Sequence, residues 1–184
     1  MIGEERDAAW YDEVFATSTD YSKPTAHAPW HPVWVAVSGC VHADAAVLDM
    51  GCGPGHVAEL LEGKCVSYVG VDFSAVALRQ AKGRAPWATF LQHDLVSIPA
   101  EVFGGVTHVL LCEVLEHISF DVNLLHGIPG GMTVTLSVPT FDAEGHVRIF
   151  KTQESVVSRY GEFIDIDFIT TVDDRWHVLH GRAK

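Results

Sequence analysis

The sequence lacks any apolar run of the length that crosses a membrane, and it is poor in positive charge. Twelve Lys and Arg residues face 24 Asp and Glu residues, giving a formal net charge of −12. Phosphate backbones are bound mainly by Lys and Arg, so this balance disfavours broad nucleic-acid binding. We therefore expect neither a membrane nor a nucleic acid as the partner.

Cysteine is also scarce. The four cysteines, Cys40, Cys52, Cys65 and Cys112, form no C-x-x-C pair and lie in or beside apolar stretches. We expect buried free thiols and no zinc site, which is typical of a cytoplasmic protein. The acidic start, "MIGEERDAAWYDEVF", has no apolar core, so no secretory signal is predicted. Most of the 11 histidines are expected on the surface.

What is present favours one α/β domain over residues 1–184, with a helical N-terminal segment (1–42) and a core (43–184). Helices are predicted at 5–17, 33–41, 56–64, 75–83 and 152–161, and strands at 45–51, 65–74, 88–95, 107–115, 130–141, 162–172 and 175–183. Ser74 and Thr152 are suitable helix caps. Early strands are almost continuously apolar and late ones alternate, which indicates a doubly wound, Rossmann-like parallel sheet ending in a hairpin.

The stretch "VLDMGCGPGHVAELL" (47–61) passes from a buried strand through Gly51, Gly53 and Gly55 into a helix. It contains neither the GK[ST] of a phosphate loop nor the G-x-G-x-x-G of a dinucleotide site. Glycine tolerates positive φ and admits a ligand close to the backbone. Two further strands end near acids, Asp72 and Asp94, and a carboxylate at the first of these places suits ribose hydroxyls.

Together these motifs resemble the class I S-adenosylmethionine-dependent methyltransferases over residues 47–138, in "VLDMGCGPG", "VGVDFS", "FLQHDL", "HVLLCEVLEHI" and "GIPGGMTVTLSVP". The resemblance implies a seven-stranded sheet and S-adenosylmethionine as the cofactor. It also implies a set of cofactor-binding residues: Asp49, Gly51, Cys52, Gly53, Gly55, Asp72, Phe73, Ser74, His93, Asp94, Leu95, Cys112 and Tyr11.

Two other features bear on the methyl acceptor. The segment "GIPGG" is short for the family, so the helices around the fourth strand are expected to be trimmed and the acceptor side more open. The N-terminal segment resembles the lid of small-molecule members. Its residues Trp10, Tyr11, Tyr21 and Trp30 would shield the cofactor's sulfonium, whereas Trp34 is expected in the core.

The sequence also lacks the [DNS]-P-P-[YFW] motif that suits nucleobase amines, and the Pro-Cys pair that suits cytosine C5. The fourth strand is instead followed by "EVLEH", expected as a short helix, and His146 follows the fifth strand. We predict Glu113, His117 and His146 as catalytic residues, with a histidine as general base. The predicted reaction is O-methylation of a small molecule or a sugar or other glycan.

Two alternatives stay open. Glu113, Glu116, His117 and His146 resemble the metal ligands of small-RNA 2′-O-methyltransferases, although "EVLEH" is frequent in class I enzymes of many specificities, so a metal-free site is predicted. A chelator would separate these two possibilities. The other alternative is a non-catalytic, cofactor-binding subunit that serves a partner enzyme.

Overall fold

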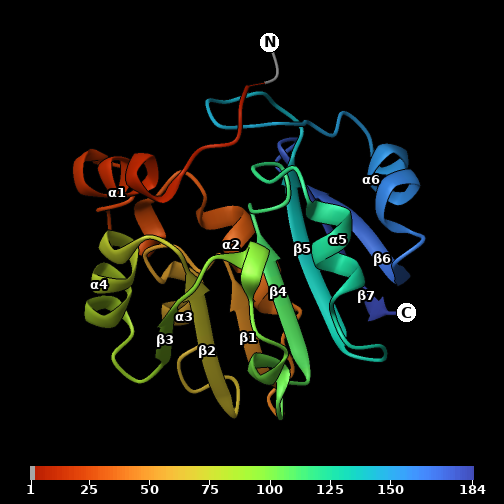
Figure 1. The fold of residues 1–184 in the computed structure, drawn as a ribbon, viewed down its shortest axis with the longest axis horizontal. Helices are drawn as coiled ribbons and strands as arrows, with labels where there is room; N and C mark the ends of the chain where they lie inside the picture. The colour runs from red at the N-terminus through yellow and green to blue at the C-terminus, as the bar shows by residue number, and fades with distance from the viewer. Residues whose placement is uncertain (1–2) are drawn as a thin grey trace.

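The computed structural model describes residues 3–184, in which seven strands form one sheet in the order β3-β2-β1-β4-β5-β7-β6 (Figure 1). Strands β1 to β5 pair in parallel, and β7 is antiparallel to both β5 and β6. The strands are β1 Ala46–Met50, β2 Ser67–Asp72, β3 Thr89–Gln92, β4 His108–Cys112, β5 Thr133–Pro139, β6 Ile164–Val172 and β7 Trp176–Ala183. The predicted doubly wound, seven-stranded sheet with a C-terminal antiparallel hairpin is confirmed.

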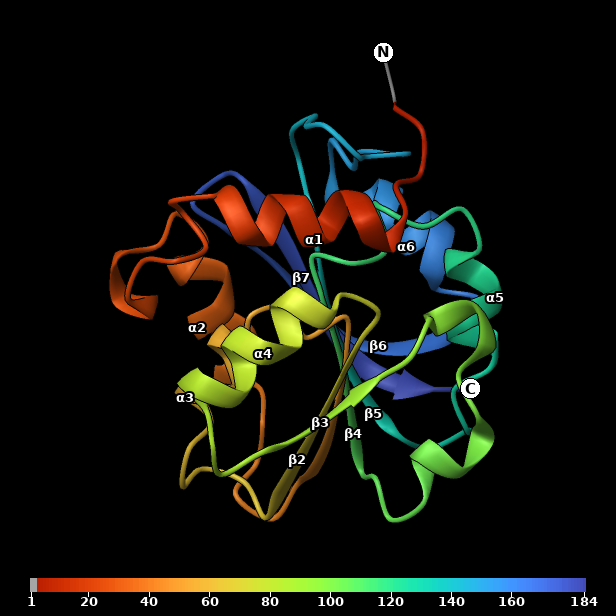
Figure 2. The same cartoon turned by 60° about the vertical axis from the view of Figure 1, so that its left-hand side comes forward.

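Helices cover both faces of this sheet, as the continuous apolar runs predict. One hydrophobic cluster joins α2, α3 and α4 to one face, and another joins α5 and α6 to the opposite face. Figure 2 shows α1 lying across one end of the sheet, above α4. The helices are α1 Ala8–Thr17, α2 His31–Gly39, α3 His56–Leu60, α4 Ala75–Arg84, α5 Asp121–His126 and α6 Gln153–Tyr160, with short 3-10 helices η1 Thr25–His27, η2 Leu95–Ser97 and η3 Ala100–Phe103.

Local signals placed several of these boundaries correctly. The Ser74 hydroxyl accepts a hydrogen bond from the Ala77 N–H at the start of α4, and the Thr152 side chain accepts one from Ser155 N–H at the start of α6. The hairpin between β6 and β7 turns at Asp173 and Asp174, both at positive φ. The helix α5 has only six residues, which agrees with the expected trimming beside β4.

Other expectations were wrong. Cys40 and Cys65 are only half-buried, although Cys52 and Cys112 are buried as expected. Only four of the 11 histidines are exposed, because several occupy strands or the loops that pack on them. Helix α3 ends at Leu60 rather than at residue 64, since the chain enters a turn that takes Gly63 to positive φ.

Among the described residues, no helix is long and apolar enough to cross a membrane.

Candidate active site

A cavity of about 800 Å³ opens where the parallel strands β1, β2 and β4 end. This is the place at which open α/β sheets bind their ligands. Residues of α1, of the turn after β1 and of the loops after β2, β3 and β4 line it. All thirteen of the predicted cofactor-binding residues except Gly55 and Ser74 belong to its wall, as do Glu113 and His117.

The three glycines of the turn after β1 all take positive φ, but they serve different purposes. A Cβ on Gly51 would lie 2.5 Å from a methyl group of Val114, and one on Gly55 would lie 2.9 Å from Ala81. These two glycines therefore allow close packing within the protein. A Cβ on Gly53 would meet only Phe15, at 3.8 Å, and Gly53 lines the cavity. Gly51 lines the cavity as well, but of the three glycines only Gly53 has room where a Cβ would stand.

Asp72, at the end of β2, is buried and holds the glycine turn in place. Its carboxylate accepts hydrogen bonds from the backbone N–H groups of Gly53 at 2.9 Å and Ser74 at 2.8 Å. Burial raises its pKa to about 6, and these hydrogen bonds oppose the rise. An ionised carboxylate accepts up to about four hydrogen bonds, so Asp72 retains capacity for ligand hydroxyls. Asp94, by contrast, is exposed and accepts a hydrogen bond from Val96 N–H.

Asp49 is buried deeper in the same wall. The hydroxyl of Tyr68 donates a hydrogen bond to one of its carboxylate oxygens, and the other oxygen has no hydrogen-bond partner in the described part of the chain. Burial raises the pKa of Asp49 to about 7. A buried carboxylate with an unpaired oxygen at a cavity wall is suited to a cationic ligand group. The neighbouring thiols of Cys52 and Cys112 are buried, which raises their pKa values above the ordinary thiol range.

The N-terminal segment supplies an aromatic wall. Tyr21 and Trp30 stack with ring centroids 4.4 Å apart, and Tyr11 packs 5.3 Å from Phe73. Trp34 is in the core, as expected, and also reaches the cavity. The lining does not include Trp10, whose ring lies under the Arg6 guanidinium at 5.5 Å.

The expected short helix at "EVLEH" does not form. Glu113 takes a φ of +58°, so the chain turns sharply after β4 and residues 114–117 form a turn. The Glu113 carboxylate accepts hydrogen bonds from Ser137 Oγ and Trp176 Nε1, both at 2.8 Å. Burial raises the pKa of Glu113 to about 7. The prediction of a helix here is therefore wrong, and Glu113 and His117 do not share a helical face.

The same turn gathers a different set of groups. Ligand atoms of Glu116, His117 and His146 lie within 4.8 Å of one another, and among the described residues Glu113 is outside this group. His117 Nε2 is 3.6 Å from the Glu116 carboxylate, and its Nδ1 is 3.1 Å from the Gly145 carbonyl oxygen. Burial lowers the pKa of His117 to about 4. His117 lines the cavity, whereas His146 lies behind it.

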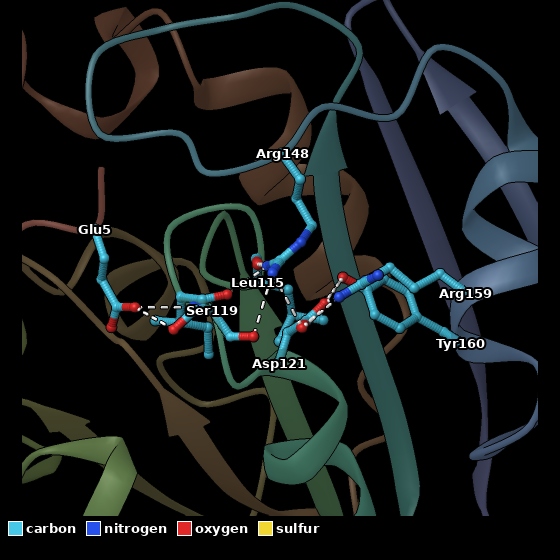
Figure 3. A network of polar contacts seen from close by, with 8 residues as sticks. Glu5, Leu115, Ser119, Asp121, Arg148, Arg159 and Tyr160 are labelled. Atoms are coloured by element: carbon cyan, nitrogen blue, oxygen red, sulfur yellow. Dashed lines mark hydrogen bonds and ion pairs between the residues drawn. The ribbon is translucent and has the colours of Figure 1, made fainter. Parts of the chain in front are cut away.

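The network that shapes this loop could not be inferred from the sequence (Figure 3). Arg148 donates to the carbonyls of Leu115 and Ile118, and it pairs with Asp121 at 3.2 Å. Ser119 in turn donates through its N–H and its hydroxyl to Glu5 of the N-terminal segment, at 3.0 and 2.7 Å. The only signal for Arg148 was a lone cation within the apolar segment "HVRIF".

The cavity fits S-adenosylmethionine as a bound group. Asp72 would hold ribose hydroxyls, the apolar side chains Phe73 and Leu95 would hold the adenine, and the unpaired oxygen of Asp49 suits an ammonium group. Gly53 leaves room at the backbone. The volume lies within the range of roughly 300–1,000 Å³ that is usual for ligand pockets.

Comparisons with known proteins agree with this geometry. Residues 47–127 match the family model described as "Methyltransferase domain". Two curated trans-aconitate 2-methyltransferases match. The one from Afipia carboxidovorans is 32% identical over 97 residues, covering 50% of this chain and 38% of the relative. The one from Rhodopseudomonas palustris is 31% identical over 112 residues, covering 58% and 44%. The chain spans about two fifths of the length of these relatives.

Two solved structures share the whole fold. The N-methyltransferase NodS from Bradyrhizobium japonicum, in complex with S-adenosyl-L-homocysteine, superposes with a TM-score of 0.75 at 15% identity over 97% of this chain and 99% of that one. The [4+2]-cyclase SpnF superposes with a TM-score of 0.76 at 13% identity over 100% and 97%. The fold is of the doubly wound α/β class, with a glycine-turn cavity at the strand ends. Over residues 47–127 the chain matches a methyltransferase domain, and its fold is the one seen in the N-methyltransferase NodS.

Proposed function

We propose that the protein binds S-adenosylmethionine in the strand-end cavity and transfers its methyl group to an oxygen of a small-molecule acceptor. The observation that carries the cofactor part is the Asp72 carboxylate, which ties the Gly53 backbone to the end of β2 and faces the cavity. The cofactor supplies an electrophilic methyl group on a sulfonium. The chain's own residues position both partners and exclude water from them.

The charge of the wall supports a neutral acceptor. Within residues 3–184, Arg6 is the only Lys or Arg in the lining, and it is paired with Glu144 at 3.2 Å. Glu5, Asp7 and Glu113 bring negative charge to the same wall. A multiply anionic acceptor such as trans-aconitate would find little compensation here, so the names of the relatives do not carry over. A hydroxyl group of a small molecule or a sugar suits the wall better.

The catalytic roles of Glu113, His117 and His146 stay predictions. A proton-accepting role of Glu113 is supported by its place in the cavity wall and by burial, which raises its pKa to about 7. The N-terminal segment 1–42 is proposed as a lid, which its aromatic contribution to the wall supports. The cytoplasmic setting is likewise a proposal, supported by four free thiols.

Calorimetry tests the cofactor part. S-adenosylmethionine and its demethylated product should bind in the micromolar range, about −8 kcal/mol, and NADH should not compete. Binding of NADH with no binding of S-adenosylmethionine would overturn the proposal. SpnF shares this fold and is named a cyclase, so transfer must be measured apart from binding. A screen of hydroxylated acceptors, read by mass for a methyl group gained, should give product, whereas cofactor binding without any product favours the non-catalytic alternative.

A further inference from the structure

Behind the acceptor end of the cavity lies a buried group of three residues, Glu116, His117 and His146, that come from two separate loops. The Glu116 side chain is 0% exposed, yet neither of its carboxylate oxygens has a hydrogen-bond partner among the described residues. A buried carboxylate without partners is costly, because nothing replaces the water it has lost. Its charge therefore requires either a proton or a cation.

Both imidazoles are oriented by the backbone so that one nitrogen remains free. His117 holds its Nδ1 against the Gly145 carbonyl, which leaves Nε2 with its lone pair toward Glu116, 3.6 Å away. His146 is hydrogen-bonded to the backbone of Phe141, while its Nδ1 is buried and has no partner in the part of the chain that the structure describes. A backbone carbonyl behind the ring is the usual partner of a metal-binding histidine, since it fixes the tautomer and aims the other nitrogen at the ion.

The two loops are also fastened to each other around this group. The Glu116 carbonyl accepts a hydrogen bond from the Val147 N–H at 2.7 Å. Arg148 adds hydrogen bonds to the carbonyl of Leu115, as Figure 3 shows, and to the carbonyl of Ile118. These contacts hold the three side chains close before any ion binds, which reduces the entropy lost on binding.

We propose that Glu116, His117 Nε2 and His146 Nδ1 bind one divalent first-row transition ion, of which Zn²⁺ is the probe. Two imidazole nitrogens and one carboxylate are ligands that such ions accept, whereas Mg²⁺ requires oxygen ligands. The ligand atoms lie within 4.8 Å of one another. Neighbouring ligand atoms around a bound ion are roughly 3–4 Å apart, so the present spacing is slightly wider. Small side-chain rotations close that difference. The ion neutralises Glu116 and joins the loop after β4 to the loop after β5. With both imidazoles bound to the ion, neither histidine is the general base, and Glu113 keeps the proton-accepting role proposed above.

The test uses the full chain without an affinity tag, stripped with a chelator and dialysed. No methyl donor is present, so the result is independent of the proposed methyl transfer. Calorimetry should show one tightly bound Zn²⁺ per chain, and Zn²⁺ should raise the melting temperature in a way that chelator reverses. Mg²⁺ at the same concentration should do neither. Co²⁺ should compete with Zn²⁺ for the same site, because both ions accept imidazole and carboxylate ligands.

Glu116→Gln and His146→Asn should each weaken Zn²⁺ binding by more than about 100-fold, since loss of even an outer-shell partner costs about 10–100-fold. His126→Gln removes an exposed histidine on α5 and should leave the affinity unchanged. Wild-type protein that binds no Zn²⁺, or both variants binding as tightly as wild type, would overturn the proposal. Glu116 is then a protonated acid that donates to His117. If the variants do not fold, NMR spectra of the wild-type histidines decide: chelator-reversible shifts of the His117 and His146 imidazoles on addition of Zn²⁺ support the site, and Zn²⁺ shifts confined to other histidines, or none, exclude it.

Discussion

The backbone N–H of Gly53 donates a hydrogen bond to the Asp72 carboxylate across 2.9 Å, joining the turn after β1 to the end of β2. Both residues line the cavity, Gly53 with its backbone and Asp72 with its carboxylate. The contact belongs both to the glycine turn and to the proposed ribose site. Variants of either residue should therefore be measured for cofactor affinity and for folding stability separately.

Replacement of Asp72 by Ala should weaken S-adenosylmethionine binding by about 1.5–3 kcal/mol, through loss of charge-assisted hydrogen bonds. The fold should persist with reduced stability, because the backbone N–H groups of Gly53 and Ser74 lose their acceptor. Calorimetry measures the affinity and circular dichroism the fold. Asp94→Ala is the matched control at the end of the next strand and should have a smaller effect, since Asp94 is exposed. Unchanged affinity in Asp72→Ala would mean that the ribose lies elsewhere.

Gly53→Val should reduce cofactor affinity, because the new side chain enters the cavity. The strain of a positive φ affects folding stability, and a control variant measures it. Gly63 provides the control, because it also has positive φ and a Cβ there would meet nothing within 4 Å. Both substitutions should cost about 1–2 kcal/mol of folding free energy for the left-handed backbone. Only Gly53→Val should also impair binding, measured by calorimetry on folded protein. Equal binding by the two variants would show that Gly53 is required by the turn alone.

Arg148→Met should destabilise the fold by about 3–5 kcal/mol, because it removes one partner of a buried ion pair with Asp121, whose side chain is 0% exposed. Chemical denaturation measures the free energy of unfolding. Arg159 also pairs with Asp121 and will offset part of the loss. Arg79→Met, at an exposed position of α4, should change stability by less than about 0.5 kcal/mol. Similar losses in both variants would argue against a specific role of Arg148.

Stability should fall on acidification partly through His108. Burial lowers its pKa in the folded state to about 4, whereas an unfolded histidine titrates near 6.5. The unfolded chain therefore binds the proton first. The contribution of His108 is complete above about pH 6.5 and is lost toward pH 4, with a slope of about 1.4 kcal/mol per pH unit. Denaturation curves of His108→Gln should show a shallower slope in this window. His126→Gln, an exposed change, should keep the wild-type slope, and an unaltered slope in His108→Gln would contradict the assignment.

Local chemistry encodes much of the fold. Apolar runs and alternation specified the strands, Ser74 and Thr152 marked the starts of helices, and the glycine turn with Asp72 marked the cavity. These features are readable because each depends on residues close together in the chain, through periodicity, capping or allowed φ. The same signals overextended α3 and produced a helix at "EVLEH" that does not exist.

Tertiary structure alone decided the arrangement of side chains in the loops after β4 and β5. Glu113 adopts a positive φ that its residue type disfavours, and Ser137 and Trp176 from neighbouring strands hold its carboxylate there. Glu116 and His146 meet only because β4 and β5 are adjacent in the sheet and their loops leave from the same edge. The sequence by itself determined the strands, the glycine turn and the acid at the end of β2. The side chains that face one another beyond β4 depend on packing between distant segments, which no local pattern encodes.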